Sequence, residues 1–244
     1  MYLSVITPTY NSQETILKCI NSVTKQNFKN YEHIIIDNNS GDTTLKLIRD
    51  VKNKNIKIIS KKDKGLYFAM NKGSRIALGR YLLFLNSDDY LIDNKFFKDT
   101  FKILKNKKYD ILYSNIIYKK NRIQIQRKYK TGIIPSQLKL GWHLPHPGTI
   151  INKSLLENMN YFDTDYKISA DFDFFFRCLL NKNVSYFYYD KFTVHMLPGG
   201  QSSGFKNIIK SNIECYKSLK KNNYNNPLLF IFLNWLGKFF NLVK

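Results

Sequence analysis

The chain has 244 residues, 43% of them hydrophobic, and its 39 Lys and Arg against 18 Asp and Glu give a formal net charge of +21. This size and apolar content fit one α/β domain, alone or with a small appendage, and exclude a disordered chain. The three cysteines are far apart and odd in number, which argues against a disulfide framework or a zinc site. The positive charge indicates an anionic partner, which could be nucleic acid, an acidic membrane surface or a phosphorylated substrate.

In the first half of the chain, apolar runs typical of strands alternate with segments typical of helices. Strands are predicted at 5–6, 33–37, 56–60 and 81–85, and helices from about 11 to 27, at 43–51 and at 68–78. Asn11 and Glu14 have the spacing of a helix N-cap pair, and Gly79 is the expected C′ residue of the third helix. The N-terminal run has no basic n-region, so we interpret it as the first strand rather than a signal peptide. The alternation predicts βαβ units and a mostly parallel sheet.

The second half has a less regular pattern. It predicts helices at 95–107 and 170–180, and strands at 110–114, 122–129, 149–151 and 184–189, with an irregular loop at 131–148. We expect one domain at residues 1–225, made of a first half at 1–110 and a second half at 111–225, with a separate helix after it at 226–244.

Two adjacent acids, Asp88 and Asp89, come directly after the fourth strand. Thr9 and Asp37 also stand where strands end, so all four residues are expected at one edge of the sheet, where open α/β sheets bind ligands. Adjacent carboxylates repel each other, and a divalent cation relieves that repulsion because hard cations prefer carboxylate oxygens. The alternative is a strand that ends in a solvated acidic turn.

The last segment, 228–244, is almost wholly apolar. Its polar residues recur at spacings that place them on one helical face; they are Asn234, Lys238, Asn241 and Lys244. Its short length and its polar stripe argue against a membrane span. It is either an interfacial anchor or a last helix packed on the domain, and its aromatic content and the positive charge of the chain favour membrane contact.

Taken together, motifs spread over residues 2–204 resemble those of the family 2 glycosyltransferases, which have the GT-A fold. In chain order the motifs are Pro8-Thr9-Tyr10-Asn11, Asp37 with Ser40-Gly41-Asp42, Asp63-Lys64-Gly65 through Asn71-Lys72-Gly73, Asn86-Ser87-Asp88-Asp89, His146-Pro147-Gly148-Thr149, Ala170-Asp171-Phe172-Asp173 with Arg177, and His195. Each motif is weak alone, whereas their order and spacing are specific. The resemblance implies a mostly parallel, Rossmann-like sheet flanked by helices, to which the C-terminal amphipathic helix is added.

The resemblance also implies a donor site for a nucleotide-sugar, expected to be a UDP-sugar. Asp37 would bind the uracil and ribose, with Thr9 beside it. Lys64 would contact the nucleotide or its diphosphate, as a lysine suits phosphate. Asp88 would face the ribose.

A divalent metal, Mn²⁺ or Mg²⁺, is implied at the diphosphate. Asp89 would hold it, and His195 resembles the histidine that completes the metal or diphosphate site, although a structural role for this histidine is the alternative. Ser87 stands where the family's DXD motif has its first acid, which makes Asp89 more critical.

Asp171 matches the family's catalytic base, which would take the proton of the acceptor hydroxyl. Because Ala170 stands where the family usually has an acid, Asp173 remains an alternative base, or an acid placed at a helix N-terminus for its dipole. Arg177 stands four residues after Asp173, so an ion pair between them is expected.

An acceptor-side group of residues is implied around the loop 131–148. His146 is expected to support the site near the donor sugar and acceptor, and Trp142 and His143 are expected to line the acceptor groove.

The implied activity is an inverting transfer of a single sugar, since the chain lacks the Gln-x-x-Arg-Trp motif and the membrane helices of processive members. The implied acceptor is a polyprenyl-diphosphate-linked saccharide at the cytoplasmic face of an anionic membrane, in the assembly of a capsule, O-antigen or exopolysaccharide. Rival interpretations are a nucleotidyltransferase, whose Gly-rich N-terminal loop is absent, a non-catalytic GT-A scaffold, and a nucleic-acid-binding protein, for which no module signature is found.

Overall fold

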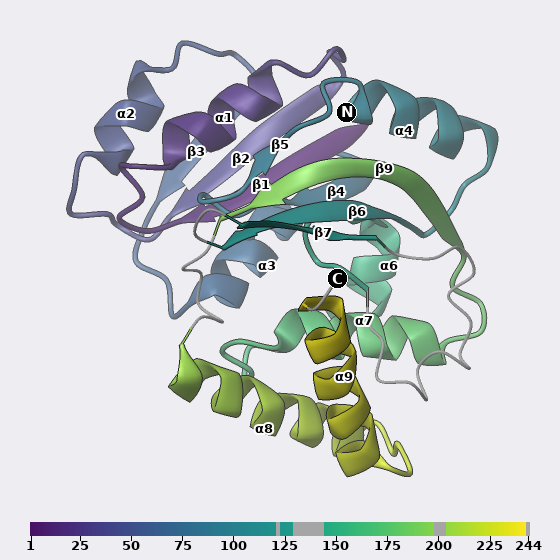
Figure 1. The fold of residues 1–244 in the computed structure, drawn as a ribbon. Coiled ribbons are helices and arrows are strands. Elements are labelled where there is room, and N and C mark those ends of the chain that lie inside the picture. The colour runs from purple at the N-terminus through teal and green to yellow at the C-terminus, as the bar shows by residue number, and fades with distance from the viewer. Residues whose placement is uncertain (121–122, 129–143, 198–203, 243–244) are drawn as a thin grey trace.

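The centre of the molecule is a twisted sheet of nine strands, shown in Figure 1. The computed structural model describes residues 1–120, 123–128, 144–197 and 204–242. Within these ranges the strands are β1 (Leu3–Thr9), β2 (Tyr31–Asp37), β3 (Ile56–Ser60), β4 (Tyr81–Phe84), β5 (Tyr90–Leu91), β6 (Ile111–Lys120), β7 (Ile123–Arg127), β8 (Ile150–Asn152) and β9 (Tyr186–Met196). The helices are α1 (Ile16–Thr24), α2 (Thr44–Asp50), α3 (Leu66–Ile76), α4 (Phe96–Asn106), α6 (Lys153–Asn158), α7 (Ala170–Leu180), α8 (Phe205–Lys221) and α9 (Pro227–Leu242).

The strand order is β3-β2-β1-β4-β8-β6-β9-β5, and β7 pairs with β6. The first four strands are parallel, as predicted. Beyond β4 the sheet is mixed, because β8 runs antiparallel to both β4 and β6 while β9 runs parallel to β6. Ile150 and Ile151 of β8 would be buried whether the strand ran parallel or antiparallel to its neighbours. Their apolar pattern therefore does not predict the antiparallel direction.

Several predicted boundaries are wrong, among them the ends of the strands predicted at 110–114 and 184–189 and the start of the first helix. The strand predicted at 184–189 is β9, which continues to Met196 through the exposed Asp190 and Lys191, where the pairing with β6 shifts register at a bulge. The first helix begins at Ile16 and is not capped by Asn11, whose backbone has a φ of +47°. Asn11 instead accepts a hydrogen bond from the amide of Gly41 and ties two loops at the sheet edge together.

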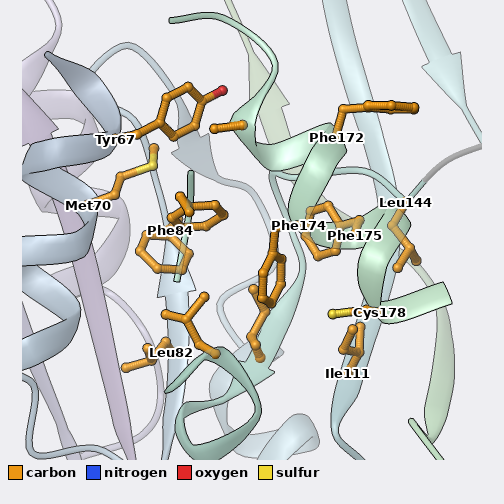
Figure 2. Packing of buried hydrophobic residues seen from close by; sticks show 14 of the residues in the cluster. Tyr67, Met70, Leu82, Phe84, Ile111, Leu144, Phe172, Phe174, Phe175 and Cys178 are labelled. Carbon is orange, nitrogen blue, oxygen red and sulfur yellow. The ribbon is translucent and has the colours of Figure 1, made fainter. Parts of the chain in front are cut away.

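Helices cover both faces of the sheet, with α1, α2 and α4 on one side and α3, α6 and α7 on the other (Figure 1). The face toward α3 and α7 holds the larger core, in which Phe84 of β4 lies between Met70 of α3 and Phe174 of α7 (Figure 2). The rings of Phe174 and Phe175 in α7 are both almost fully buried. Burying one such ring contributes about 1.5–3 kcal/mol, so α7 is held firmly against the sheet.

The C-terminal helix α9 contacts the domain near its first turn. Phe230 is 1% exposed and packs edge-on against Phe172, Phe176 and Tyr224, with ring centroids 5.6, 6.0 and 5.6 Å away. This is the packing that was the alternative to membrane contact. Exposed apolar side chains remain elsewhere on the helix, at Leu228, Leu229 and Phe232. In the described part of the chain, no helix combines the length and the apolar character needed to cross a bilayer.

Gly79 lies where the chain passes close to β1, and it is not the helix C′ residue expected from the sequence. The helix α3 ends at Ile76, and Gly79 is absent from the glycines with a positive φ. A Cβ atom at this position would lie 2.5 Å from the backbone nitrogen of Ser4. The amide of Gly79 also donates to the Ser4 hydroxyl at 2.8 Å. Close approach of two backbones, rather than a left-handed turn, explains this glycine.

We predict that Gly79→Ala lowers the free energy of unfolding by about 1–3 kcal/mol, because the added methyl group overpacks a backbone contact that has no flexible side chain to yield. Urea denaturation measures the change. Gly41→Ala is the matched control, since a Cβ there meets nothing within 4 Å. Equal stability of the two variants would contradict the close approach.

Candidate active site

Polar residues from three neighbouring strands meet at the carboxyl edge of the sheet. Thr9 ends β1 directly opposite Asp37, which ends β2. β1 pairs on its other side with β4, whose chain continues into Asp88 and Asp89. The strand order therefore changes direction between β1 and β4, which is the place where open α/β sheets bind ligands. The hydroxyl of Ser12 lies 2.8 Å from that of Ser87 and joins the loops after β1 and β4.

Asp37 is fully buried beneath this edge. Its carboxylate accepts from the hydroxyl of Ser40 at 2.5 Å and from the hydroxyl of Ser60 at 2.6 Å, and Ser40 adds its amide at 3.1 Å. Beside it, the buried hydroxyl of Thr9 has no hydrogen-bond partner among the described residues. A buried polar atom without a partner is costly, so this edge suits a polar ligand.

Lys64 lies on the loop between β3 and α3 and is exposed. The next residue, Gly65, has φ +149° and ψ 178°, a backbone conformation open to glycine and strained for other residues. This glycine sets the turn that presents Lys64 at the start of α3. Lys64 forms no ion pair within the described residues, so its ammonium group is available to an anion.

Asp88 and Asp89 concentrate negative charge in a poorly solvated place. Asp89 is 2% exposed, and burial together with the charge of Asp88 holds its pKa well above the usual range. Its carboxylate accepts a hydrogen bond from the Asn86 side-chain amide at 3.2 Å. Burial also raises the pKa of Asp88.

This acid pair has the chemistry of a divalent-metal site. Neither Asp88 nor Asp89 has a cationic partner in the part of the chain that the structure describes. Buried carboxylates without a counter-ion favour a hard cation such as Mg²⁺ or Mn²⁺. The residues therefore fit the metal implied by the sequence, although the described residues contain no group of three or more His, Cys, Asp or Glu side chains arranged around one point.

His195 is brought to the same edge by β9. It is 5% exposed and stacks on Tyr90, with 4.7 Å between ring centroids and 17° between planes. Lys18 of α1 lies over the Tyr90 ring, with its Nζ 3.7 Å from the centroid. His195 pairs with Tyr90, the residue that follows Asp89, across β9 and β5. This strand pairing brings His195 next to the acid pair.

A second group of residues surrounds Asp171 in the first turn of α7. The hydroxyl of Tyr67 lies 2.9 Å from Asp171 Oδ1 and 2.7 Å from the carbonyl oxygen of Ile168. Burial and the nearby charge of Asp171 raise the pKa of Tyr67, so its hydroxyl stays protonated and donates. Asp171 keeps 30% of its side chain exposed, as a group that meets a substrate requires.

His146 lies on the other side of Asp171. Its Nδ1 is 3.8 Å from Asp171 Oδ2, and its ring packs against Phe84, Phe162 and Phe175. Burial lowers the pKa of His146, with a smaller opposing effect from Asp171, so the imidazole is neutral at neutral pH. Its buried Nε2 has no hydrogen-bond partner among the described residues. This position fits the supporting role expected for it.

Asp173 faces away from this group. It is 1% exposed, and its carboxylate accepts hydrogen bonds from the Nε of Arg177 at 2.8 Å and from the hydroxyl of Ser218 at 2.7 Å. The predicted ion pair with Arg177 is therefore confirmed. Both residues line a cavity of about 890 Å³ to which Asp171 does not contribute. Of the two candidate bases, the exposed one is therefore Asp171.

Two expected acceptor residues and one unexpected site residue remain. Trp142 and His143 lie outside the described residues. Tyr67 belongs to the motif at 63–73, but nothing in that motif indicated a role of its own for the tyrosine. Its contact with Asp171 joins residues 104 positions apart, and a periodic pattern contains no such information.

The chain is similar to known proteins in sequence and in fold. A family model described as glycosyl transferase family 2 matches residues 4–172. The UDP-Glc:alpha-D-GlcNAc-diphosphoundecaprenol beta-1,3-glucosyltransferase WfgD of Escherichia coli is 34% identical over 122 residues, which are 47% of this chain and 48% of the relative. The match thus spans about half the length of that enzyme.

Solved structures share the fold. TarS of S. aureus in complex with UDP-GlcNAc superposes with a TM-score of 0.74 at 25% identity, over 91% of this chain and 65% of that one. The mannosyltransferase PcManGT of Pyrobaculum calidifontis, in complex with GDP-Man and Mn²⁺, gives 0.66 at 14% identity, over 95% of this chain and 68% of that one, a likeness of fold alone. Because the family model matches residues 4–172, which are most of the chain, the chain belongs to glycosyl transferase family 2, and it has the GT-A fold.

Proposed function

We propose that the protein is an inverting, metal-dependent transferase that moves one sugar from a UDP-sugar to a lipid-linked saccharide. The observation that carries this proposal is the partly exposed carboxylate of Asp171, held by Tyr67 and His146 and separate from the acid pair Asp88 and Asp89. One group of acids would serve the donor and the other the acceptor.

The donor half would be formed by the edge of β1, β2 and β4. Asp37 and Thr9 would bind the nucleoside, Asp88 would face the ribose, and Lys64 would contact the diphosphate. Asp89 and His195 would hold the divalent metal. When bound, that metal supplies positive charge that stabilises the departing diphosphate.

The acceptor half would carry the proton transfer. Asp171 would accept the proton of the acceptor hydroxyl while the oxygen forms a bond to the anomeric carbon and the bond from that carbon to UDP breaks. Attack from the face opposite UDP inverts the anomeric centre and needs no protein nucleophile. Tyr67 would keep Asp171 in place by donating a hydrogen bond to its Oδ1, and His146 lies beside its Oδ2.

The lipid-linked acceptor and UDP are proposed from the relatives of the chain and from its charge. WfgD is named for a UDP-Glc donor and a diphosphoundecaprenol acceptor, and TarS was solved with UDP-GlcNAc. A net charge of +21 suits an acceptor diphosphate at an anionic membrane. We therefore propose residues 1–225 as the catalytic domain at the cytoplasmic membrane face, in polysaccharide assembly, with the helix at 226–244 in contact with that membrane.

Substituting the proposed base tests the chemistry. We predict that Asp171→Asn lowers kcat by about 10²–10⁴-fold while donor binding is kept, because a positioned base contributes on that order. UDP release is measured with a GlcNAc-diphospholipid acceptor, and donor binding is measured as the thermal shift given by UDP and Mn²⁺. Asp173→Asn is the matched control, expected to lose stability through its contacts with Arg177 and Ser218 but to retain turnover per folded molecule. Turnover by Asp171→Asn within a few-fold of the parent would move the base elsewhere.

We predict that removing the charge of Asp89 stabilises the metal-free protein but weakens its metal-dependent binding of UDP. The folded pKa of Asp89 is raised above the unfolded value, so the metal-free protein loses stability as the pH rises through that range and the buried carboxylate ionises. In EDTA at pH 7.5, Asp89→Asn should therefore have a higher Tm than the parent. The same variant should lose the additional thermal shift that Mn²⁺ gives with UDP.

The pH dependence provides a further check on the same residue. Protons compete with the metal for a carboxylate of raised pKa, so the Mn²⁺-dependent shift of the parent should weaken as the pH falls toward 5.5. Asp165→Asn, an exposed loop acid, is the control and should change neither property. A lower Tm for metal-free Asp89→Asn, or a retained Mn²⁺ effect, would be incompatible with a buried metal carboxylate.

A further inference from the structure

The helix α8 exposes a stripe of large apolar side chains that no described residue covers. Phe205, Ile208, Ile209 and Ile213 are 78%, 50%, 45% and 50% exposed. Their spacing of three, one and four residues puts them on one side of the helix. Figure 1 shows α8 at the outer edge of the molecule, beyond α7. This helix lies beyond the residues that the family model matches.

Lysines overlap one edge of the stripe and extend beyond it. At about 100° per residue the stripe runs from about −60° at Ile208 to about +80° at Ile213, measured from Phe205. The exposed lysines of the helix lie at about 60–140° on the same scale; they are Lys206, Lys210, Lys217 and Lys220. The acid of the helix, Glu214, is 7% exposed and faces the domain. An apolar stripe bordered by lysines is the arrangement of a helix that lies in a membrane interface, where the stems are buried and the ammonium groups reach anionic headgroups.

The opposite face of α8 holds the segment that carries the proposed base. The Glu214 carboxylate accepts from the amides of Lys167, Ile168 and Ser169 at 3.0, 2.8 and 2.9 Å. The hydroxyl of Ser211 lies 2.8 Å from that of Ser169, which precedes α7. A carboxylate is well placed there, because it satisfies amide groups at a helix N-terminus and favours the helix dipole. The same helix thus has one face toward the surface and one against the residues next to Asp171.

We propose that α8 docks the protein on an anionic lipid surface through Phe205, Ile208, Ile209 and Ile213 and their bordering lysines. The charge of the helix selects a membrane over an apolar protein partner, because every exposed charge along it is positive. Docking would then place the segment 167–171 close to the membrane, on the side of α8 that faces the domain. The inference rests on the proposed function in one respect, the lipid-linked acceptor, which must reach Asp171 from the bilayer.

The test compares vesicle binding by surface variants of the full chain. Ile209→Glu/Ile213→Glu alters the stripe and Lys206→Glu/Lys210→Glu alters its border. The matched control is Leu78→Glu/Leu180→Glu, which changes two exposed leucines outside α8. Co-sedimentation uses vesicles of phosphatidylcholine with 30 mol% phosphatidylglycerol, a composition of roughly the charge of bacterial-type anionic surfaces, and vesicles of phosphatidylcholine alone. The thermal shift given by UDP and Mn²⁺ reports folding and the donor site in every variant.

The parent and the control should bind the anionic vesicles, and each α8 variant should bind more than about tenfold more weakly, since one lysine at such a surface contributes on the order of fivefold. Binding should fall with salt and with neutral vesicles. Hydrogen exchange of peptides covering 205–221 and 165–175 should slow on vesicle binding. If the parent binds vesicles but gives no UDP shift, the proposed donor fails while the docking surface stands.

Three results would overturn the inference. They are parent-like vesicle binding by the α8 variants, failure of the parent to bind anionic vesicles, and a parent dimer that Ile209→Glu/Ile213→Glu converts to a monomer, which would make the stripe a contact between two copies. Loss of vesicle binding by Leu228→Glu/Phe232→Glu, with the α8 variants unaffected, would assign the docking to α9 instead.

Discussion

A buried negative charge governs the arrangement of this molecule. Asp89 lies beside Asp88, is almost fully buried, accepts a hydrogen bond from Asn86 and has no cationic partner in the part of the chain that the structure describes. Such a group destabilises a fold unless a ligand supplies the missing charge. Proteins keep such destabilising groups at functional sites. The acid pair lies at the switch point between β1 and β4, where open α/β sheets bind ligands.

The two halves of the site come from different kinds of structure. The proposed donor half depends on the register of parallel strands, which aligns Thr9 with Asp37 at one edge. The position of the proposed base depends on helix packing, because Asp171 is placed by α7, by Tyr67 of α3 and by the hydrogen bonds of Glu214 to the turn before it. Helix α3 links the halves, since its N-terminal loop carries Lys64 and its first turn carries Tyr67. A shift of α3 would therefore reach both.

Strand ends and local spacing were enough to predict part of the site from the sequence. The gathering of Thr9, Asp37 and Asp89 required only that parallel strands share a carboxyl edge, and the pair of Asp173 with Arg177 required only helical spacing. The direction of β8, the contact of Tyr67 with Asp171 and the exposed stripe of α8 depend on which distant segments pack together. An apolar pattern predicts that a side chain is buried, but not which distant residue it packs against. These features are therefore visible only in the folded molecule.

The carboxyl edge of β1, β2 and β4 is proposed to bind a uridine diphosphate through a metal. Isothermal titration calorimetry of the unmodified protein with UDP, in Mn²⁺ and in EDTA and with GDP as the competitor nucleotide, measures this binding. We expect binding of UDP that Mn²⁺ strengthens by about tenfold or more and that GDP does not match. Absence of UDP binding under all conditions, together with salt-sensitive binding of single-stranded DNA, would contradict the proposed donor site and favour a scaffold or nucleic-acid role for the basic surface.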